Sequence, residues 1–260
     1  METNLKVLQY FEQRLKILDD VHFAMTNGYE VTTAFQRIVD KDNKLIGYEA
    51  LLRPFQDGIA CTASEFLDVM RKDQEIERID RLIRALHYRN FSLLTEKSPY
   101  LFLNYEYESL TDITNMDTYR KLLLKRQAEL GISALSTVIE ILEHEVKSEH
   151  WLMMMSQWRR KNDGILIALD DIVDSPGVWD RIRMIQPDIV KIDQSMLPAS
   201  NYTDFVKRLQ AFGMKILQEG IETEQHKNQA LAAGVDWLQG YYIAYPALIA
   251  LIKTRKKEVI

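Results

Sequence analysis

The amino-acid sequence predicts an eight-stranded β/α barrel with an N-terminal helical extension. Three observations lead to this fold class: a length of 260 residues, a hydrophobic content of 47%, and short apolar runs that alternate with helical stretches from about residue 32 onward. A chain of this length and composition can bury a substantial core. Alternating strands and helices are typical of parallel β/α units, and eight such strands favour a closed barrel over an open sheet.

The first 25 residues form a unit of their own. Leu8, Phe11 and Leu15 follow one another at steps of three and four, which predicts an amphipathic helix over residues 1–25. Such a helix can pack on the body of the protein or against a partner. Packing on the body is favoured, because the pattern covers too few heptads for a coiled coil. Residues 26–260 are then expected to form the barrel domain.

The rest of the chain alternates between two periodicities. Eight apolar or β-branched runs are predicted as strands: Ala34–Val39, Leu45–Leu51, Tyr100–Leu103, Ser136–Ile141, Ile165–Leu169, Ile189–Ile192, Met214–Leu217 and Trp237–Tyr242. The predicted helices between them include Ala63–Arg71, Glu75–Leu94, Asp117–Leu130, Val146–Lys161, Asp204–Phe212 and Glu224–Ala233. The glycines do not have the spacing of a phosphate-binding loop, so neither a dinucleotide-binding fold nor a P-loop fold is supported.

Composition and charge exclude several function classes. The single cysteine, Cys61, cannot form an intramolecular disulfide and is typical of a reducing compartment, so a cytoplasmic location is expected. No uninterrupted apolar run approaches the ~18 residues of a membrane span, so no membrane-spanning segment is expected. The net charge of −5 disfavours binding to DNA or RNA polymers but is compatible with a site for a small anionic ligand.

Polar residues stand at the ends of seven predicted strands. They are Glu49 and Arg53, Asn104, Glu140 and Glu143, Asp170 and Asp171, Lys191 and Asp193, Glu219 and Glu222, and Gln239. In a β/α barrel the carboxyl ends of the strands meet at one face, so these side chains should converge there. Each residue alone could be a helix cap or a surface residue. Eight carboxylates at one barrel mouth would repel one another unless cations lay among them.

The predicted ligands indicate the metal and the reaction. Carboxylates and an amide, without histidine or cysteine, suit Mg²⁺ or Mn²⁺ better than Zn²⁺. Two such ions about 3.5–4 Å apart can polarise a phosphodiester and generate a hydroxide nucleophile, which predicts phosphoester hydrolysis. Arg53 suits a substrate phosphate, Lys191 and Asp193 should both face the reacting centre, and Glu219 could act as general base. The adjacent Asp170 and Asp171 can share one site only where the strand ends and the backbone turns.

Seven motifs resemble one family in order and spacing. They are GYEALLRP (47–54), FLN (102–104), IEILE (139–143), LDD (169–171), VKID (190–193), EGIET (219–223) and QGYYIAYP (239–246). This series resembles the EAL-domain cyclic di-GMP phosphodiesterases from about Phe35 to Pro246. The resemblance implies a TIM-like (β/α)8 barrel of the EAL type that hydrolyses cyclic di-GMP to linear pGpG with two divalent cations, Mg²⁺ or Mn²⁺.

The resemblance also implies a role for each of these residues. The family's metal ligands correspond to Glu49, Asn104, Glu140, Asp170 and Asp171. Its catalytic lysine, the companion aspartate and the proposed general base correspond to Lys191, Asp193 and Glu219. Its substrate-binding positions correspond to Arg53, Gln36, Leu52 and Gln239, and its supporting positions to Glu143 and Glu222. None of these positions is substituted.

The sequence departs from the family pattern close to these residues. After the aspartate pair the family usually has Phe-Gly in a glycine-rich loop that links the metal site to a dimer interface, whereas this chain has Ile172–Ser175. Gln218 stands where a small apolar residue is usual, Arg37 where proline is common, and Leu142 where a small hydroxyl residue is usual. These departures put the rate, the metal affinity and the coupling to a dimer in question.

Two functions are compatible with the sequence. The first is a metal-dependent phosphodiesterase with cyclic di-GMP as its substrate, which the complete set of acids together with Asn104 and Lys191 favours. The alternative is a catalytically impaired EAL domain that binds cyclic di-GMP or a protein and acts as a regulator; the altered loop after Asp171 motivates it. A homodimer is compatible with both functions.

Overall fold

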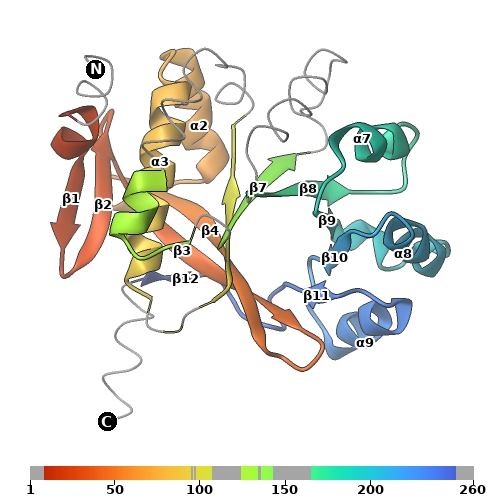
Figure 1. The fold of residues 1–260 in the computed structure, drawn as a ribbon. Coiled ribbons are helices and arrows are strands. Elements are labelled where there is room, and N and C mark those ends of the chain that lie inside the picture. The colour runs from red at the N-terminus through yellow and green to blue at the C-terminus, as the bar shows by residue number, and fades with distance from the viewer. Residues whose placement is uncertain are drawn as a thin grey trace, which may run out of the picture.

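The computed structural model describes residues 9–94, 96, 98–106, 124–133, 136–142 and 165–249, and a closed barrel of eight strands lies at its centre (Figure 1). The barrel strands are β3 (Tyr29–Asp40), β4 (Leu45–Gln56), β6 (Tyr100–Asn104), β7 (Thr137–Leu142), β8 (Leu166–Ile172), β9 (Ile189–Ile192), β10 (Lys215–Gln218) and β11 (Trp237–Leu238). They pair in the order β3, β11, β10, β9, β8, β7, β6, β4, and the pairing of β4 with β3 closes the barrel. Every predicted strand overlaps one of these eight, so the predicted fold class is confirmed.

The expectation of all-parallel units is wrong for β3. This strand runs antiparallel to both of its barrel neighbours, β4 and β11, whereas the other pairs in the barrel are parallel. Only a short turn separates β3 from β4, and it is closed by hydrogen bonds between Asp40 and both Asn43 and Lys44. A parallel connection needs a crossover of a dozen or more residues, so this short turn forces the two strands to be antiparallel.

The helix predicted over residues 1–25 is wrong beyond residue 14. Described residues 9–14 are helical, but β1 (Leu15–Leu18) and β2 (Val21–Thr26) form an antiparallel hairpin. Asp19 and Asp20, both at positive φ, form its two-residue turn, a conformation that aspartate tolerates better than most residues. Because β2 pairs with β3, the sheet crosses the predicted boundary between residues 25 and 26.

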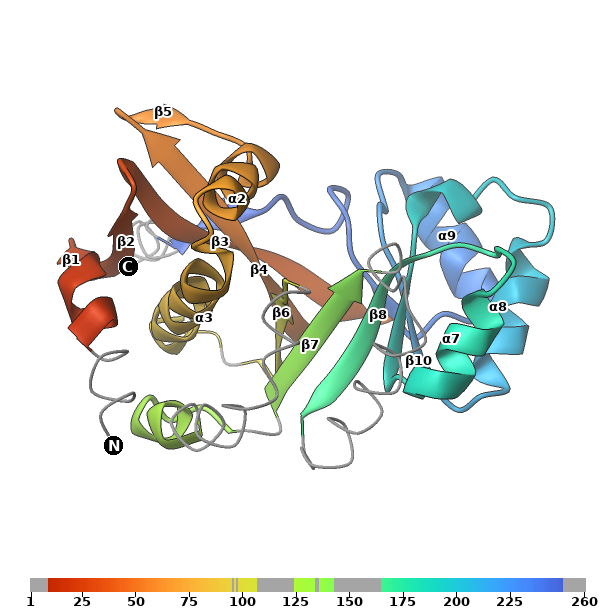
Figure 2. The same ribbon diagram turned by 90° about the horizontal axis from the view of Figure 1, so that it is seen from above.

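Two groups of helices flank the barrel on opposite sides. Helices α2 (Ala63–Lys72) and α3 (Ile76–Ser92) pack against β2, β3 and β4, while α7 (Val178–Ile185), α8 (Tyr202–Gln210) and α9 (Glu224–Ala233) lie beside β8 to β11 (Figure 2). Further short elements of the described chain are β5 (Ile59–Ala60), the helical residues 124–129, the 3₁₀ turn Gln194–Met196 and β12 (Ala247–Leu248), which pairs with β3. The predicted helix Val146–Lys161 lies outside the described residues.

An apolar layer closes the interior of the barrel at one level. Ile38, Phe102, Ala168, Leu217 and Trp237, from five different strands, pack together there in a buried cluster. Gly47 lies against this layer, and a side chain at that position would bring a Cβ atom within 2.8 Å of the Phe102 ring. Because side chains on a strand alternate between faces, the residues two positions away point into the barrel at the next level.

A buried side-chain network fastens the N-terminal hairpin to α3. Asn90 accepts a hydrogen bond from the backbone N–H of His22 and donates to its carbonyl, both at 3.0 Å, and also donates to Thr33 Oγ1 at 3.2 Å. Thr33 Oγ1 lies 2.8 Å from His87 Nδ1, and burial lowers the pKa of His87 to about 3, so this imidazole is neutral. The network fixes β2 on the helix without any charged group.

Replacing Asn90 by leucine is expected to destabilise the fold. The variant loses both hydrogen bonds to the partly buried backbone of His22, at a cost of about 1–3 kcal/mol for each group that loses its partner. Urea unfolding of the purified chain measures this change. The control is Arg78→Ala on the same helix, where Arg78 is exposed and pairs with Glu75, and it should change stability by less than about 0.5 kcal/mol. Equal losses for the two variants would contradict this role of Asn90.

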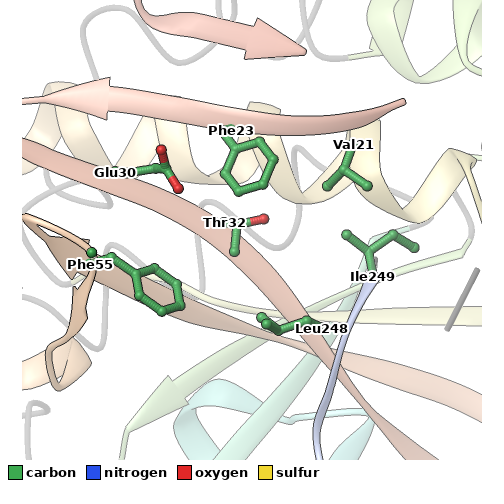
Figure 3. A pocket seen from close by; sticks show the side chains of 8 residues that line it. Val21, Phe23, Glu30, Thr32, Phe55, Leu248 and Ile249 are labelled. Carbon is green, nitrogen blue, oxygen red and sulfur yellow. The ribbon is translucent and has the colours of Figure 1, made fainter. Parts of the chain in front are cut away.

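A pocket of about 240 Å³ opens between the hairpin and the barrel (Figure 3). It is lined by Val21, Phe23, Glu30, Thr32, Phe55, Gly58, Leu248 and Ile249, from β2, β3, β4, β12 and the loop after β4. None of the predicted site residues lines it. In the part of the chain that the structure describes, no helix has the length and apolar character needed to cross a membrane.

Candidate active site

Five predicted site residues stand one level away from the apolar layer of the barrel. Four of them lie two positions after a residue of that layer, either in a parallel strand or directly after it: Asn104, Asp170, Glu219 and Gln239. The fifth, Gln36, lies two positions before Ile38, because β3 runs in the opposite direction. The two-residue period therefore directs all of them into the same end of the barrel. Glu49 lies directly opposite Gln36 in the register of β4 with β3.

Lys191 lies at the centre of a group of carboxylates. Its Nζ is 2.6 Å from Glu140 Oε1, 2.9 Å from Asp170 Oδ1, 3.0 Å from Glu219 Oε1 and 3.9 Å from Glu49 Oε1. Its side chain is 1% exposed. One positive charge thus faces four acidic groups supplied by four further strands or strand ends, and the excess of negative charge favours binding of additional cations.

Burial and mutual repulsion change the pKa values of this group. Burial raises the pKa of Glu140 well above its usual value, and the nearby Glu49 and Asp170 add to this, although Lys191 opposes it. The pKa of Glu219 is raised in the same way, by burial first and then by Asp170 and Glu49. Burial alone would lower the pKa of Lys191, but the surrounding carboxylates outweigh it and raise that pKa well above its usual value. Lys191 is therefore charged, and two of the acids accept protons unusually readily.

A β-bulge lets the two adjacent aspartates serve one site. Between Leu169 and Ile172, β8 has one residue more than the segment of β9 that it pairs with. Asp171 there adopts a positive φ of 56°, and its N–H donates to Asp170 Oδ1 at 3.1 Å. The predicted turn is thus present, but it lies inside β8 rather than at its end. The bulge brings one carboxylate oxygen each of Asp170, Asp171 and Glu219 within 4.8 Å of one another.

The described residues fit a divalent metal ion. The donors that converge here are carboxylate and amide oxygens, which suit hard cations. Glu140 Oε2 is buried and has no hydrogen-bond partner among the described residues, so a ligand position there is open. The sequence predicted that Glu219 lies at the same barrel mouth as the aspartate pair but assigned it as a base; its position beside both aspartates also makes it a candidate ligand.

Asn104 and Gln239 hold Glu49 in place, and Gln36 holds Gln239. Asn104 Nδ2 donates to Glu49 Oε1 at 3.2 Å, and Gln239 Nε2 donates to Glu49 Oε2. Gln239 Nε2 also lies 3.2 Å from Gln36 Oε1, and Gln36 Nε2 donates to the carbonyl of Ala244 at 3.2 Å. The predicted metal ligands Glu49 and Asn104 and the predicted substrate residues Gln36 and Gln239 therefore form one connected network.

Arg53 lies farther along β4 on the same face of the strand as Glu49. Its Nη1 donates to the carbonyl of Leu52 at 2.8 Å, and among the described residues most of its other guanidinium donors have no partner. Burial lowers the pKa of Arg53, while Glu49 and Tyr241 act in the opposite direction. Leu52 points to the other face and packs against the apolar cluster under α2 and α3. The structure thus gives Arg53 a position beside the acidic group and Leu52 a packing role.

Three predicted residues do not join the described cluster. Asp193 lies just beyond β9, where its carboxylate accepts a hydrogen bond from Ser195 N at 2.9 Å and caps the 3₁₀ turn instead of approaching Lys191. Glu222 is exposed in the loop before α9. Glu143 lies outside the described residues. Glu219 and Gln239 also lie one residue beyond their strands, so the end of β9 at Ile192 does not by itself explain the difference. Asp193 differs because its carboxylate caps the 3₁₀ turn that follows.

Gln218 is a structural residue that sequence reasoning noted only as a departure. Its side chain is fully buried; its Nε2 donates to the carbonyls of Ile192 at 3.1 Å and Glu219 at 2.9 Å, and its Oε1 accepts from the Tyr202 hydroxyl at 2.8 Å. It therefore joins β9, β10 and α8 immediately beside Glu219. The tyrosine in α8 explains why this chain carries a polar residue here.

Replacing Gln218 by leucine is expected to lower the free energy of unfolding by about 2 kcal/mol, because the buried Tyr202 hydroxyl loses its partner. Urea unfolding measures the loss. Gln210→Leu is the matched control, since Gln210 is exposed and its loss should cost less. In the double variant Tyr202→Phe/Gln218→Leu part of the stability should return. Strictly additive losses would show that the two side chains do not depend on each other.

The segment after the aspartate pair is tied to α8. Ile172 is fully buried, and Asp174 accepts a hydrogen bond from Asn201 at 2.8 Å and lies 3.7 Å from Arg208. Arg37, another departure, pairs with Glu96 at 2.6 Å near the other end of β3. Neither departure removes a residue from the carboxylate group around Lys191.

Comparison with known families places the whole barrel in one of them. Residues 19–246, which include all eight barrel strands, match the profile of the EAL domain. The chain belongs to the EAL domain family. The resemblance of its seven motifs to this family is thereby confirmed, and the match begins inside the β1–β2 hairpin.

Relatives of this EAL domain include named phosphodiesterases. An uncharacterised EAL-domain protein of Bacillus subtilis, YkuI, is 29% identical over 86% of this chain and 56% of its own length. The cyclic di-GMP phosphodiesterase CdgJ of Vibrio cholerae is 29% identical over 85% of this chain and 45% of its own length. The chain thus spans about half the length of these two relatives.

Solved structures share the fold of this EAL domain. The FimX EAL domain of Pseudomonas aeruginosa bound to cyclic di-GMP has a TM-score of 0.74 and 19% identity, with 94% of this chain and 96% of that chain covered. The Bacillus subtilis YkuI protein in complex with cyclic di-GMP and calcium has a TM-score of 0.70 and 24% identity over 98% of this chain and 63% of that chain. At these identities the likeness establishes the shared barrel.

Proposed function

We propose that this EAL domain hydrolyses cyclic di-GMP to linear pGpG in a reaction that depends on two divalent cations, Mg²⁺ or Mn²⁺. The observation that carries the proposal is the buried Lys191 among four carboxylates at the carboxyl end of the barrel. Its relatives support the substrate, because CdgJ is named a cyclic di-GMP phosphodiesterase and several solved EAL domains are bound to cyclic di-GMP.

The metal ions would be held by residues that already converge. Glu49, Asn104, Glu140, Asp170 and Asp171 are the proposed ligands, and Glu219 offers an additional oxygen beside the aspartates. When bound, such ions polarise a phosphodiester and make a water molecule a better nucleophile. The strong negative charge of the site and the unpartnered Glu140 Oε2 support this assignment.

The side chains of the chain position the substrate and move protons. Lys191 provides a fixed positive charge toward the developing charge of the phosphodiester. Glu219, whose pKa burial raises, is the proposed base that takes a proton from the attacking water. Arg53 would bind a substrate phosphate, Gln36 and Gln239 would contact the nucleotide, and Leu52 would act through packing. Asp193, Glu143 and Glu222 are proposed to support the surrounding loops.

Hydrolysis of cyclic di-GMP by the purified chain tests the proposal. The expected result is pGpG, resolved by chromatography, from the wild-type chain and none from Glu49→Ala. Cyclic di-GMP that binds but is not cleaved would instead indicate the regulatory alternative. A Glu49→Ala variant as fast as wild type would exclude Glu49 as a ligand.

Cytoplasmic location and homodimer formation remain predictions, and solution scattering over a concentration series would measure the oligomeric state.

A further inference from the structure

Exposed aromatic side chains gather in one short segment after β11. Of the large hydrophobic residues exposed in the described chain, three are tyrosines of a single five-residue stretch: Tyr241 is 51% exposed, Tyr242 46% and Tyr245 70%. The rings of Tyr241 and Tyr245 are stacked, with centroids 4.6 Å apart and planes at 20°. Each ring uses one face for this contact, and both residues remain half or more exposed, so aromatic surface is left in contact with solvent.

This aromatic pair stands on a rigid backbone. Ile221 N donates to the carbonyl of Gln239 at 3.0 Å, and Tyr242 N donates to the carbonyl of Ile221 at 2.8 Å. Ala244 N donates to the carbonyl of Gly240 at 3.0 Å, and Gly240 approaches Ile221 so closely that a Cβ atom would lie 2.2 Å from its nitrogen. Preorganised contact groups lose little entropy on binding, so such a segment suits recognition.

The pair also stands beside the candidate active site. Gln239, two residues before Tyr241, donates to Glu49, and Gln36 donates to the carbonyl of Ala244, directly before Tyr245. Tyr241 is close enough to Arg53 to influence its pKa. A nucleotide whose phosphate lies at Arg53 and the carboxylate group would therefore have its base near these rings.

We propose that the stacked Tyr241 and Tyr245 form a platform on which a purine base of the substrate stacks. The inference rests on the proposed function and extends it from phosphodiester chemistry to base binding. Stacking on an aromatic ring strengthens nucleotide binding by about 10-fold or more, and it tolerates any base because every base has a π face. The platform thus favours nucleotides over sugar phosphates and does not separate guanine from adenine.

Two measurements on the full chain test the platform. The first compares equilibrium binding of GMP with that of ribose 5-phosphate, which lacks the base; neither contains a phosphodiester, so binding needs no turnover. The wild-type chain should bind GMP at least 10-fold more tightly, and Tyr245→Leu should remove most of this difference. The second measures cyclic di-GMP hydrolysis, where Tyr245→Leu should raise KM about 10-fold and change kcat less than twofold.

Two control variants separate stacking from a general loss of structure. Tyr245→Phe keeps the ring and should retain wild-type binding. Phe212→Leu removes another exposed ring, which is stacked on Trp179 at 5.9 Å near α7 and α8, and should leave both measurements unchanged. Equal preference for GMP in the wild type and Tyr245→Leu would overturn the platform. A wild-type chain that prefers GMP but does not cleave cyclic di-GMP would overturn the proposed function alone.

Discussion

Replacing Lys191 by methionine is expected to abolish hydrolysis and to lower the free energy of unfolding at neutral pH by about 3–5 kcal/mol, because it leaves a buried group of carboxylates without its central cation. The four acids lie 2.6–3.9 Å from Nζ in the native chain. Methionine matches the length of the lysine stem, so the loss measures the missing charge. Urea unfolding and cyclic di-GMP hydrolysis are the two measurements.

The stability of the Lys191→Met variant should depend on pH with a defined sign. The pKa values of Glu140 and Glu219 are raised in the folded chain, and removing Lys191 raises them further. A folded state that binds more protons than the unfolded state gains stability as the pH falls. The variant should therefore approach wild-type stability as the pH is lowered from 8 toward the ordinary glutamate pKa of about 4.3.

Lys215→Met is the matched control for this prediction. Lys215 is 57% exposed and pairs with Asp236 at 2.6 Å on the surface. Exposed ion pairs contribute about 0–1 kcal/mol, so this variant should lose little stability and show no comparable pH dependence. If both lysine variants lost the same stability, the carboxylate group around Lys191 would not depend on the charge of Lys191 as its geometry indicates.

The Asp170→Asn variant should lose activity without losing stability. The substitution preserves shape but removes one of the four acidic groups around Lys191, so repulsion within the group falls and the free energy of unfolding should not decrease. Loss of about 4 kcal/mol of transition-state stabilisation would lower kcat by about 1,000-fold. Initial rates of pGpG formation and urea unfolding measure the two effects on the same preparation.

Asp174→Asn provides the matched control for Asp170→Asn. Asp174 lies four residues later, contacts Asn201 and Arg208, and stands outside the carboxylate group. Its replacement should change kcat by less than twofold. An Asp170→Asn chain that retained wild-type kcat would remove Asp170 from the proposed ligands, and one that unfolded would show that Asp170 is needed for the fold.

Local sequence rules were sufficient for the residues that point into the barrel. Asn104, Asp170 and Gln239 each follow an apolar strand residue by two positions, and the two-residue period of a strand fixes which face they share. The same rule failed for Asp193, because its carboxylate caps the 3₁₀ turn that follows β9. Such predictions fail where a local hydrogen bond to the following turn uses the side chain.

Other features depend on contacts that a single sequence does not reveal. The apolar steps before residue 25 fit a helix as well as a hairpin, and the turn at Asp19–Asp20 and pairing with β3 decide for the hairpin. The bulge at Asp171 depends on its register against β9. The role of Gln218 depends on Tyr202, which is distant in sequence. In each case tertiary contacts determine the local conformation.

The most direct test of the metal-dependent site is to measure pGpG formation against the number of Mn²⁺ ions bound. Chelator-treated protein is titrated with Mn²⁺, and bound ions and the rate of cyclic di-GMP hydrolysis are measured on the same samples. The proposed site predicts no hydrolysis without metal and a rate that rises until about two ions are bound per chain. Full hydrolysis in excess chelator, or unchanged Mn²⁺ binding in Glu49→Ala and Asp170→Asn, would contradict it.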